Sequence, residues 1–324
     1  MQRRQVSQAL ATLASAAALA PTSVVAQSDK SLKILLGFPP GGSIDVLGRL
    51  LAEGMKDELK QNIIVDNKPG AAGRLAAELF KNTPPDGSTV MITPVVVPVL
   101  APMVFSKLNY DPKTDLVPVA HLANFNFAIG VRADSPLKNL GELIAWFKAN
   151  PQKAAYGTPG AGSLPHFFGL QIGKAAGVDI IHVPFAGGGP LLIALLGDQI
   201  PAGIDVELEF LQSVKAGKIR VLATSGAKRT KVYPDVPTFV EQGMPSVLGS
   251  GWFSMFAPRG TATAEIERVN RAANKVLAKP DVAVRLLGLG LEVAGGSAAD
   301  LQKVLDADTA RWGPVVKASG FKAD

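Results

Sequence analysis

The stretch that most constrains the fold joins a short apolar run to a helical pattern near the start of the chain. Residues 32–36 are mostly apolar and few enough for a buried strand. Residues 39–42, Pro-Pro-Gly-Gly, cannot continue that strand, because prolines lack a backbone N–H and glycines lack a Cβ. Ser43 suits a helix N-cap, and residues 44–51 carry apolar side chains at helical spacing. This unit places backbone N–H groups where an anion can bind, although a tight turn without a ligand has the same pattern.

A second loop of the same kind lies in mid-chain. Residues 156–166 read Tyr-Gly-Thr-Pro-Gly-Ala-Gly-Ser-Leu-Pro-His, after a strand-like run at 154–156 and before a helix expected over 167–176. Two glycine-rich, hydroxyl-bearing loops in the two halves of one chain suggest two lobes that face one ligand.

The first 26 residues have the pattern of a secretion signal. Arg3 and Arg4 form a positive region, residues 9–20 are apolar, and small residues precede Ala26, after which we expect cleavage. The apolar segment is too short to span a bilayer as a mature helix. The paired arginines leave a twin-arginine signal open beside ordinary secretion. We therefore expect an exported, periplasmic protein.

Composition narrows the class of function. A length of 324 residues suits two domains, and the absence of cysteine excludes disulfides, zinc–thiolate sites and a thiol nucleophile. The formal net charge of +6 is a mild excess that favours anionic ligands. No basic block with interleaved aromatic residues is present, so we expect no nucleic-acid partner, and no motif calls for a cofactor.

Strands and helices alternate along both halves, which predicts parallel sheets covered by helices. The pattern gives strands at 32–36, 63–65, 89–92, 180–185, 200–206 and 220–224, and closing helices at 264–277 and 298–316. Residues 94–118 look irregular. We expect the chain to cross between lobes near 125–131 and again near 249–258. The predicted domains are a signal peptide at 1–26, a first lobe at 27–124 and 252–324, and a second lobe at 125–251.

Short motifs in a fixed order resemble the solute-binding receptors of tripartite tricarboxylate transporters, also called Bug receptors. The resemblance runs from Lys33 to about Pro314. Its motifs are residues 38–42 (FPPGG) with Asp45 and Arg49, 66–70 (DNKPG) with Gly73, 85–87 (PDG), 110–112 (YDP), 156–158 (YGT) through His166, 182–185 (HVPF), 215–218 (KAGK) and 235–238 (DVPT). Each match is short, but their order along the chain makes the resemblance specific.

The resemblance implies an α/β fold of two lobes, a type II-like periplasmic binding protein or Venus flytrap, each lobe a mostly parallel sheet flanked by helices. It implies capture of a small carboxylate by hinge closure and delivery to integral membrane permease subunits. In such receptors backbone N–H groups, hydroxyls and ordered water hold the carboxylate, which agrees with the glycine loops here. We expect a monomer.

The chain also departs from the family pattern. Phe185 and Ala186 stand where a tyrosine and a lysine are usual, and Pro159 removes one backbone donor after Thr158. Aromatic residues flank the loops and the crossing strand: Phe38, Phe125, Phe127 and Phe185. We therefore expect an aromatic or longer-chain mono- or dicarboxylate rather than a short polar acid such as citrate.

The predicted ligand-binding residues combine both loops with strand ends. They are Phe38, Pro40, Gly41, Gly42, Ser43, Thr93, Thr158, Gly160, Ala161, Gly162, Ser163, His166, Phe185 and Asp205. Several have a structural alternative: His166 can simply open a helix, Asp205 can cap a turn or orient water, and the phenylalanines can pack in the core. Asp45 lies in the first turn of its helix, where the dipole favours a carboxylate without any ligand.

Three other functions compete with a transport receptor. A secreted hydrolase is disfavoured, since no Gly-x-Ser-x-Gly elbow is present and the three histidines lack metal-ligand spacing. Ser163 and His166 are only neighbours in one loop, and no catalytic residue or metal ligand is assigned. A dinucleotide site is disfavoured because residues 160–162 lack the third glycine of that fingerprint. A ligand-sensing partner of a sensor kinase would share the same pocket, and it stays open.

Overall fold

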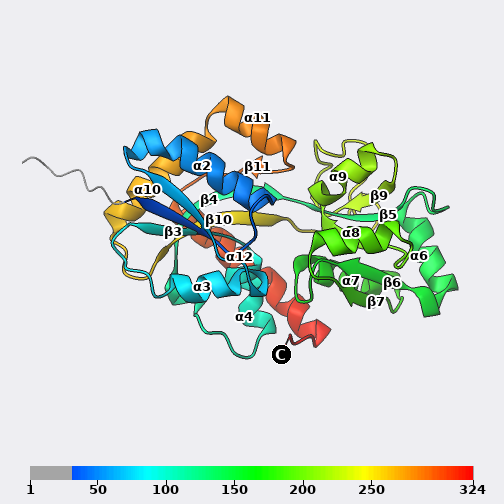
Figure 1. Ribbon diagram of the computed structural model, residues 1–324. Helices are drawn as coiled ribbons and strands as arrows, with labels where there is room; N and C mark the ends of the chain where they lie inside the picture. Colours follow the sequence, from blue (N-terminus) through cyan, green and yellow to red (C-terminus); the bar gives the residue numbers. More distant parts are fainter. Residues whose placement is uncertain (1–30, 324) are drawn as a thin grey trace, which may run out of the picture. The chain divides into compact units, whose positions relative to one another are not determined.

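The computed structural model describes residues 31–323, which form two lobes, each built on one β-sheet with helices against it (Figure 1). The predicted signal peptide, residues 1–26, and its cleavage near Ala26 lie outside the described residues. The predicted α/β class with two lobes is confirmed. Both sheets are mixed, with parallel and antiparallel neighbours.

The first sheet has the strand order β11-β4-β10-β3-β1-β2. Strand β1 pairs in parallel with both β2 and β3, as the alternation of strands and helices predicted. The remaining neighbours are antiparallel: the crossing strand β10 lies between β3 and β4, and β11 pairs with the other edge of β4. The strands are β1 (Leu32–Leu36), β2 (Ile63–Asn67), β3 (Thr89–Pro94), β4 (Leu116–Phe125), β10 (Gly251–Pro258) and β11 (Glu292–Val293).

Helices cover both faces of this sheet. Helix α2 links β1 to β2 and α3 links β2 to β3, in opposite directions across the sheet, so right-handed crossovers place them on opposite faces (Figure 1). Helix α10 packs on α2, and α12 packs on β4. The helices are α2 (Ser43–Leu59), η1 (Ala71–Gly73), α3 (Arg74–Phe80), η2 (Val96–Leu100), α4 (Ala101–Val104), α5 (Pro112–Asp115), α10 (Thr263–Leu277), α11 (Pro280–Gly288) and α12 (Ala298–Ser319).

Several of these helices differ from the sequence prediction. Residues 94–118, predicted to be irregular, contain η2 and the short helices α4 and α5, and α11 was not predicted. Pro102, Pro112 and Pro280 lie in the first turns of α4, α5 and α11. A proline there is harmless, because the N–H that it lacks has no partner within the helix. Prolines in these segments begin helices rather than exclude them.

The second sheet repeats the arrangement of the first. Its order is β7-β6-β8-β5-β9, with β6 parallel to β7 and β8, and β5 antiparallel to β8 and β9. Helices α7 and α8 connect β6, β7 and β8 as α2 and α3 connect β1, β2 and β3. The elements are β5 (Phe127–Arg132), α6 (Leu140–Ala149), η3 (Pro151–Lys153), β6 (Ala155–Thr158), α7 (Leu164–Ala176), β7 (Ile181–Pro184), α8 (Gly188–Leu196), β8 (Gly203–Val206), α9 (Glu207–Lys215) and β9 (Ile219–Thr224).

The chain passes between the sheets at two neighbouring points. Asn126 separates β4 from β5, and Ser250 precedes β10; the Ser250 hydroxyl donates to Asn126 Oδ1 at 2.7 Å. Ser225 joins the same two segments. Its Oγ accepts the N–H of Phe127 at 3.0 Å and donates to the carbonyl of Gly249 at 2.6 Å. One buried hydroxyl therefore connects both crossings.

Aromatic rings fill the space around these crossings. Phe125 lies 4.7 Å from Phe253 and 5.5 Å from Phe127, whose ring is 5.4 Å from that of Phe168, between centroids. Phe125 and Phe127 are each 5% exposed. These two rings pack the crossing segments as core residues, so they do not supply the exposed apolar lining that the sequence suggested.

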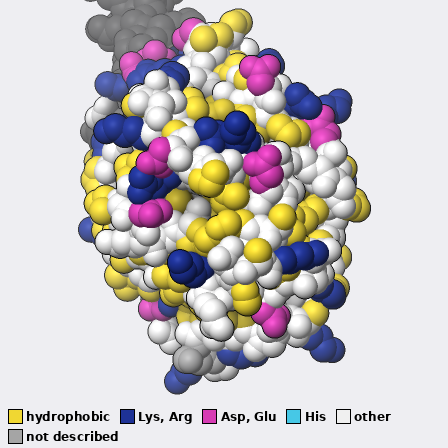
Figure 2. Space-filling view, turned by 90° about the vertical axis from the view of Figure 1, so that its right-hand side faces the viewer, with side chains coloured by type: hydrophobic (Ala, Val, Ile, Leu, Met, Phe, Trp, Pro, Cys, Tyr) yellow, Lys and Arg dark blue, Asp and Glu magenta, His cyan; other side chains and the backbone are white. Residues whose placement is uncertain are grey.

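The surface carries both signs of charge. On the face shown in Figure 2, Lys and Arg side chains are interspersed with Asp and Glu, and apolar side chains lie between them. Within residues 31–323, no helix combines the length and the apolar character needed to cross a membrane.

Candidate functional site

The first predicted loop lies between the end of β1 and the start of α2. Helix α2 begins at Ser43, and Gly42 is its N-cap, so the N-cap predicted at Ser43 is displaced by one residue. No side chain caps this helix. Among the described residues, none offers an acceptor to the N–H groups of Gly42 and Ser43. A Cβ on Gly41 or Gly42 would meet no atom within 4 Å, so the loop backbone is open on this side.

A buried carboxylate fixes this loop. Asp45 accepts the N–H of Gly41 at 2.9 Å, two bonds from Arg49 at 2.9 and 3.0 Å, and one from the Asn67 amide at 3.0 Å. Burial alone raises the pKa of Asp45, but these hydrogen bonds outweigh it and hold the pKa below its usual value. Asp45 therefore has a structural role, and the N–H of Gly41 is already engaged.

The two other predicted residues of this loop differ in exposure. Phe38 is half-buried and packs against Gly73, where an added Cβ would lie 3.0 Å from Phe38 Cε2. Gly73 also has a φ of +88°, so both the space and the backbone require glycine. Pro40 is exposed in the turn before the helix.

Two hydroxyls fix the second predicted loop, between β6 and α7. Thr158 Oγ1 and Ser163 Oγ both donate to the carbonyl of Gly160, at 3.0 and 2.7 Å. In a trans peptide the N–H points opposite to the C=O, so the N–H of Ala161 points away from both hydroxyls. Ala161 is exposed, and within residues 31–323 no acceptor lies near its N–H. The loop thus presents a free donor to its surroundings.

Two stacked imidazoles lie behind the second loop. The rings of His166 and His182 are 3.9 Å apart and nearly parallel. His166 Nδ1 accepts the N–H of Gly162 at 3.1 Å, and His182 Nε2 is 2.7 Å from Thr158 Oγ1. Burial lowers the pKa of both to about 4, and for His166 the neighbouring His182 contributes as well. Both rings are therefore neutral at pH 7 and act as hydrogen-bonding supports.

Phe185 and Asp205 lie at the ends of the neighbouring strands. Phe185 donates its N–H to the Thr158 carbonyl at 2.9 Å, and its half-buried ring packs where a Cβ on Gly157 would be 2.8 Å away. Asp205 Oδ1 accepts the N–H of Val206 at 2.7 Å. These residues share one edge of the second sheet with the loop, because the carboxyl ends of parallel strands meet there.

Among the described residues, the second carboxylate oxygen of Asp205 has no hydrogen-bond partner. Oδ2 is buried and lies beside the start of α8, where a Cβ on Gly188 would come within 2.7 Å of it. No side chain caps α8. Burial, together with nearby Glu209, raises the pKa of Asp205 to about 8. This carboxyl is therefore largely protonated at neutral pH and can donate a hydrogen bond.

Thr93 lies at the end of β3, opposite Ser254 of β10. Both side chains are fully buried, and neither hydroxyl has a partner among the described residues. Ile92, the residue before Thr93, pairs with Leu36 at the end of β1, so Thr93 lies at the sheet edge where the first loop begins, and its contact with a ligand stays a prediction.

The structure brings the predicted residues together as two groups. Residues 158–166 with Phe185 and Asp205 form one group, and residues 38–43 form the other. Within residues 31–323 no hydrogen bond or ring contact joins the two groups, so their meeting around one ligand stays a prediction. The part of the chain that the structure describes contains no set of three metal-ligating side chains placed to hold a metal ion.

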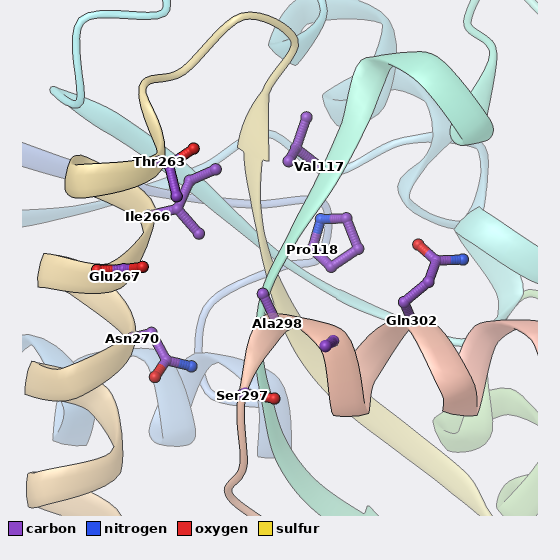
Figure 3. Close-up of a pocket in the computed structure, with 10 residues that line it drawn as sticks. Val117, Pro118, Thr263, Ile266, Glu267, Asn270, Ser297, Ala298 and Gln302 are labelled. Carbon is purple, nitrogen blue, oxygen red and sulfur yellow. The ribbon is translucent and has the colours of Figure 1, made fainter.

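Two cavities lie away from these loops. One, of about 420 Å³, lies between β4, α10 and the start of α12, with Glu267, Asn270 and Gln302 among its lining residues (Figure 3). Another, of about 390 Å³, includes Arg132 and Lys218 in the second lobe. Neither contains a predicted ligand-binding residue.

Sequence reasoning missed the supports of the second loop. His182 follows Thr158 by 24 residues, so only the parallel pairing of β6 and β7 reveals their contact. Phe321, near the C-terminus, lies against His166 at a centroid distance of 4.6 Å. The motif at residues 182–185 does not by itself predict a contact between His182 and the second loop. No local pattern indicates a partner for Phe321.

Comparison with known proteins identifies the family. The sequence profile described as "Tripartite tricarboxylate transporter family receptor" matches residues 47–321. The chain belongs to this receptor family. The resemblance predicted from the short motifs is confirmed, and so is the two-lobed fold of a periplasmic binding protein.

Similar proteins cover nearly the whole receptor. The UPF0065 protein in the gbd 5′ region of Cupriavidus necator is 35% identical over 298 residues, which are 90% of each chain. A solved R. palustris protein with adipate has a TM-score of 0.84 and 31% identity, and the match covers 90% of this chain and 98% of that one. MatC from Rhodopseudomonas palustris with bound malate has a TM-score of 0.79 and 30% identity, over 88% and 98%.

Proposed function

We propose that the protein is a periplasmic, non-catalytic receptor that captures a small carboxylate and delivers it to integral membrane permease subunits. The observation that carries the proposal is the set of unengaged backbone N–H groups on the two glycine loops, at the uncapped starts of α2 and α7. Helix N-termini favour negative charge, and several N–H groups together can satisfy both oxygens of a carboxylate. The family and the acids bound to its solved relatives support the same ligand class.

The second loop is preorganised for an anion. The hydroxyls of Thr158 and Ser163 turn the Gly160 carbonyl inward, and this removes a negative dipole from the exposed side of the loop. The same peptide directs the N–H of Ala161 outward. Donors fixed before binding lose little entropy when the ligand arrives, which favours affinity.

The size and shape of the acid are the finer part of the proposal. Adipate and malate, the acids solved with relatives, are both aliphatic dicarboxylates. Phe185 and Phe38 in this chain retain partly exposed rings beside the two loops, which favours an aromatic or long-chain acid. Offset or edge-on stacking against one ring would add about 0.5–1.5 kcal/mol. Asp205 is a candidate hydrogen-bond donor to a second carboxylate.

Capture requires the lobes to close on the ligand. We assign residues 27–124 and 252–324 to the first lobe and 125–251 to the second, with the hinge at Asn126 and Ser250. Only two crossing segments need to change their dihedrals in such a motion, as in other hinged binding proteins. Small-angle scattering should report a smaller radius of gyration at saturating ligand, and an unchanged value would contradict closure.

The loop geometry gives no support to hydrolysis. Ser163 Oγ donates to Gly160, and His166 Nδ1 accepts from Gly162, so the two side chains are turned to backbone partners rather than to each other. A general base must lie within hydrogen-bond reach of its nucleophile. We therefore expect bound acids to be recovered unchanged.

The test is calorimetric titration with adipate, malate, glutamate, citrate and benzoate-type acids. Saturable binding of at least one acid supports the receptor, and binding of none contradicts it. Preference for the benzoate type supports the aromatic assignment, whereas preference for the aliphatic acids contradicts that assignment alone.

Two glycine variants test which surface binds. Gly42→Ala and Gly160→Ala add a Cβ with no atom within 4 Å, at backbone angles that alanine accepts. Neither should change the unfolding temperature, but each should weaken binding by about tenfold or more, roughly 1.4 kcal/mol, by narrowing the approach to the N–H groups. Gly288→Ala also enters open space, far from both loops in the sequence, and is the matched control. If Gly42→Ala and Gly160→Ala bind the acid as tightly as the control Gly288→Ala, the two loops are not part of the binding site.

A further inference from the structure

The C-terminal segment after α12 reaches across to the second loop. Helix α12 ends at Ser319, and Gly320, with a φ of +65°, turns the chain. The N–H of Phe321 donates to Ser319 Oγ at 3.1 Å, and the N–H of Ala323 donates to the carbonyl of Val104 in α4 at 2.9 Å. Phe321 is thus held on both sides by elements of the first lobe.

The ring of Phe321 contacts the second lobe. It meets the ring of His166 edge-on, with centroids 4.6 Å apart and an interplanar angle of 87°. A Cβ added to Gly162 would lie 3.2 Å from Phe321 Cε1 and 3.3 Å from Val104 Cγ2. The loop backbone at Gly162 therefore rests closely on this ring, and its φ of +71° also favours glycine.

The contacted residues are the ones that shape the loop. Gly162 donates its N–H to His166 Nδ1, which fixes the peptide immediately after Ala161. The His166 ring also stacks on the ring of His182, and His182 Nε2 lies within hydrogen-bond distance of Thr158 Oγ1. Movement of the His166 ring would therefore disturb both ends of the loop at once.

We propose that Phe321 is a positioning residue for the ligand loop at residues 158–163. It does not contact the ligand; it holds the His166 ring and the Gly162 backbone, so that the N–H of Ala161 keeps its outward direction. The proposal rests on the function proposed above, because a positioned loop matters only if the loop binds.

The location of the ring distinguishes this role from ordinary packing. Phe321 follows a helix of the first lobe, yet its ring partners, His166 and Phe167, belong to α7 of the second. A residue that only packed inside the first lobe would contact the sheet of that lobe. Val315, on α12, is also partly buried against the hydrophobic core but carries no ring, and it is the natural comparison.

The test compares Phe321→Ala with Val315→Ala and Phe321→Tyr in the full mature chain. Unfolding temperature, calorimetric affinity for adipate, and amide exchange of Gly162 are measured for each. Phe321→Ala should weaken adipate binding by about tenfold, roughly 1.4 kcal/mol, and should accelerate exchange at Gly162. Phe321→Tyr keeps the ring and should restore both, whereas Val315→Ala should lower the unfolding temperature and change neither. If Phe321→Ala does not fold, Phe321→Leu replaces it.

The outcomes separate this proposal from the proposed function. Unchanged exchange at Gly162 in Phe321→Ala, or unchanged adipate affinity with a lowered unfolding temperature, overturns the positioning role. If the wild-type chain binds no acid of the panel, the proposed function fails. The exchange measurement then still decides whether Phe321 orders the loop.

Discussion

The two glycine loops occupy equivalent positions in two sheets of the same topology, but they are stabilised differently. In the first lobe one carboxylate, Asp45, gathers donors from Gly41, Arg49 and Asn67. In the second lobe no charge is used: hydroxyls, neutral imidazoles and a phenyl ring hold the loop. Both arrangements leave N–H groups unengaged at the start of a helix. Equivalent backbone geometry therefore does not require equivalent side-chain chemistry.

The difference also concerns distance along the chain. In the first loop Asp45 and Arg49 lie within one turn of α2, and Asn67 at the end of the next strand, β2, bonds to Asp45 and to the Phe38 carbonyl. The second loop depends on His182 in the next strand and on Phe321 near the C-terminus. Both loops thus use a residue of the next strand, and we expect only the second loop to respond to changes near the C-terminus.

The largest effect on stability is expected for Asp45→Ala. The change leaves the N–H of Gly41 without its acceptor, removes one of the two hydrogen bonds that Asn67 Nδ2 donates, and removes the ion pair with Arg49. Hydrogen bonds to charged groups contribute about 1.5–3 kcal/mol each and are not additive, so we expect roughly 2–4 kcal/mol of destabilisation in urea unfolding. Glu53→Ala, on the same helix, is the control. A loss below about 1 kcal/mol would show that the carboxylate is not the main support of this loop.

A smaller loss is expected for Thr158→Val. Valine keeps the shape but leaves the Gly160 carbonyl with one donor and His182 Nε2 without its partner in a buried place. We expect roughly 1–2 kcal/mol of destabilisation and weaker carboxylate binding. Ser163→Ala removes the other hydroxyl and should weaken binding with less effect on unfolding, since Ser163 is only half-buried. If both variants bind the carboxylate with full affinity, the two hydroxyls do not contribute to the binding site.

The smallest expected effect is a difference between the two loops in how their contributions to stability depend on pH. His166 and His182 have pKa values lowered to about 4, so the unfolded chain binds protons first as pH falls below the ordinary histidine value of 6.5. Their stabilisation is complete above pH 6.5 and is lost as pH falls toward 4, on the order of 1 kcal/mol after allowing for solvent. The pKa of Asp45 is lowered as well, so its contribution persists down to its ordinary value of 3.8 and is lost only below it.

Amide hydrogen exchange at pH 5, compared with pH 7, measures this difference between the two loops directly. Exchange measured for residues 158–166 should rise relative to pH 7 beyond the intrinsic change in rate, whereas that for residues 41–45 should not. The same rise in both loops would contradict the division into a charged and a neutral support.

The local units of the fold could be predicted from the sequence. The strand, glycine loop and helix at residues 32–51 were correct because Pro-Pro-Gly-Gly can only end a strand. The N-cap was misplaced by one residue, since Gly42 has the extended backbone of a cap although it has no side chain to bond. Helix α11 was missed because Pro280 was not considered as the first residue of a helix.

The support of the candidate site could not be predicted in the same way. The pairing of β6 with β7 brings His182 to Thr158, and the last turn of α12 brings Phe321 to His166. Both contacts depend on tertiary packing, which no local spacing encodes. The core packing of Phe125 and Phe127 could not be predicted for the same reason, because their rings contact Phe253 and Phe168 in other elements.

The most direct test of the central claim is an NMR titration of the ¹⁵N-labelled mature protein with the acid that binds best in calorimetry. The backbone N–H signals of Gly42 and Ser43 in the first loop, and of Ala161 in the second, should move downfield together and give one dissociation constant that matches calorimetry. The signal of Gly41, already bonded to Asp45, should move least. Saturable binding that shifts only one loop, or neither, would contradict a carboxylate held between the two.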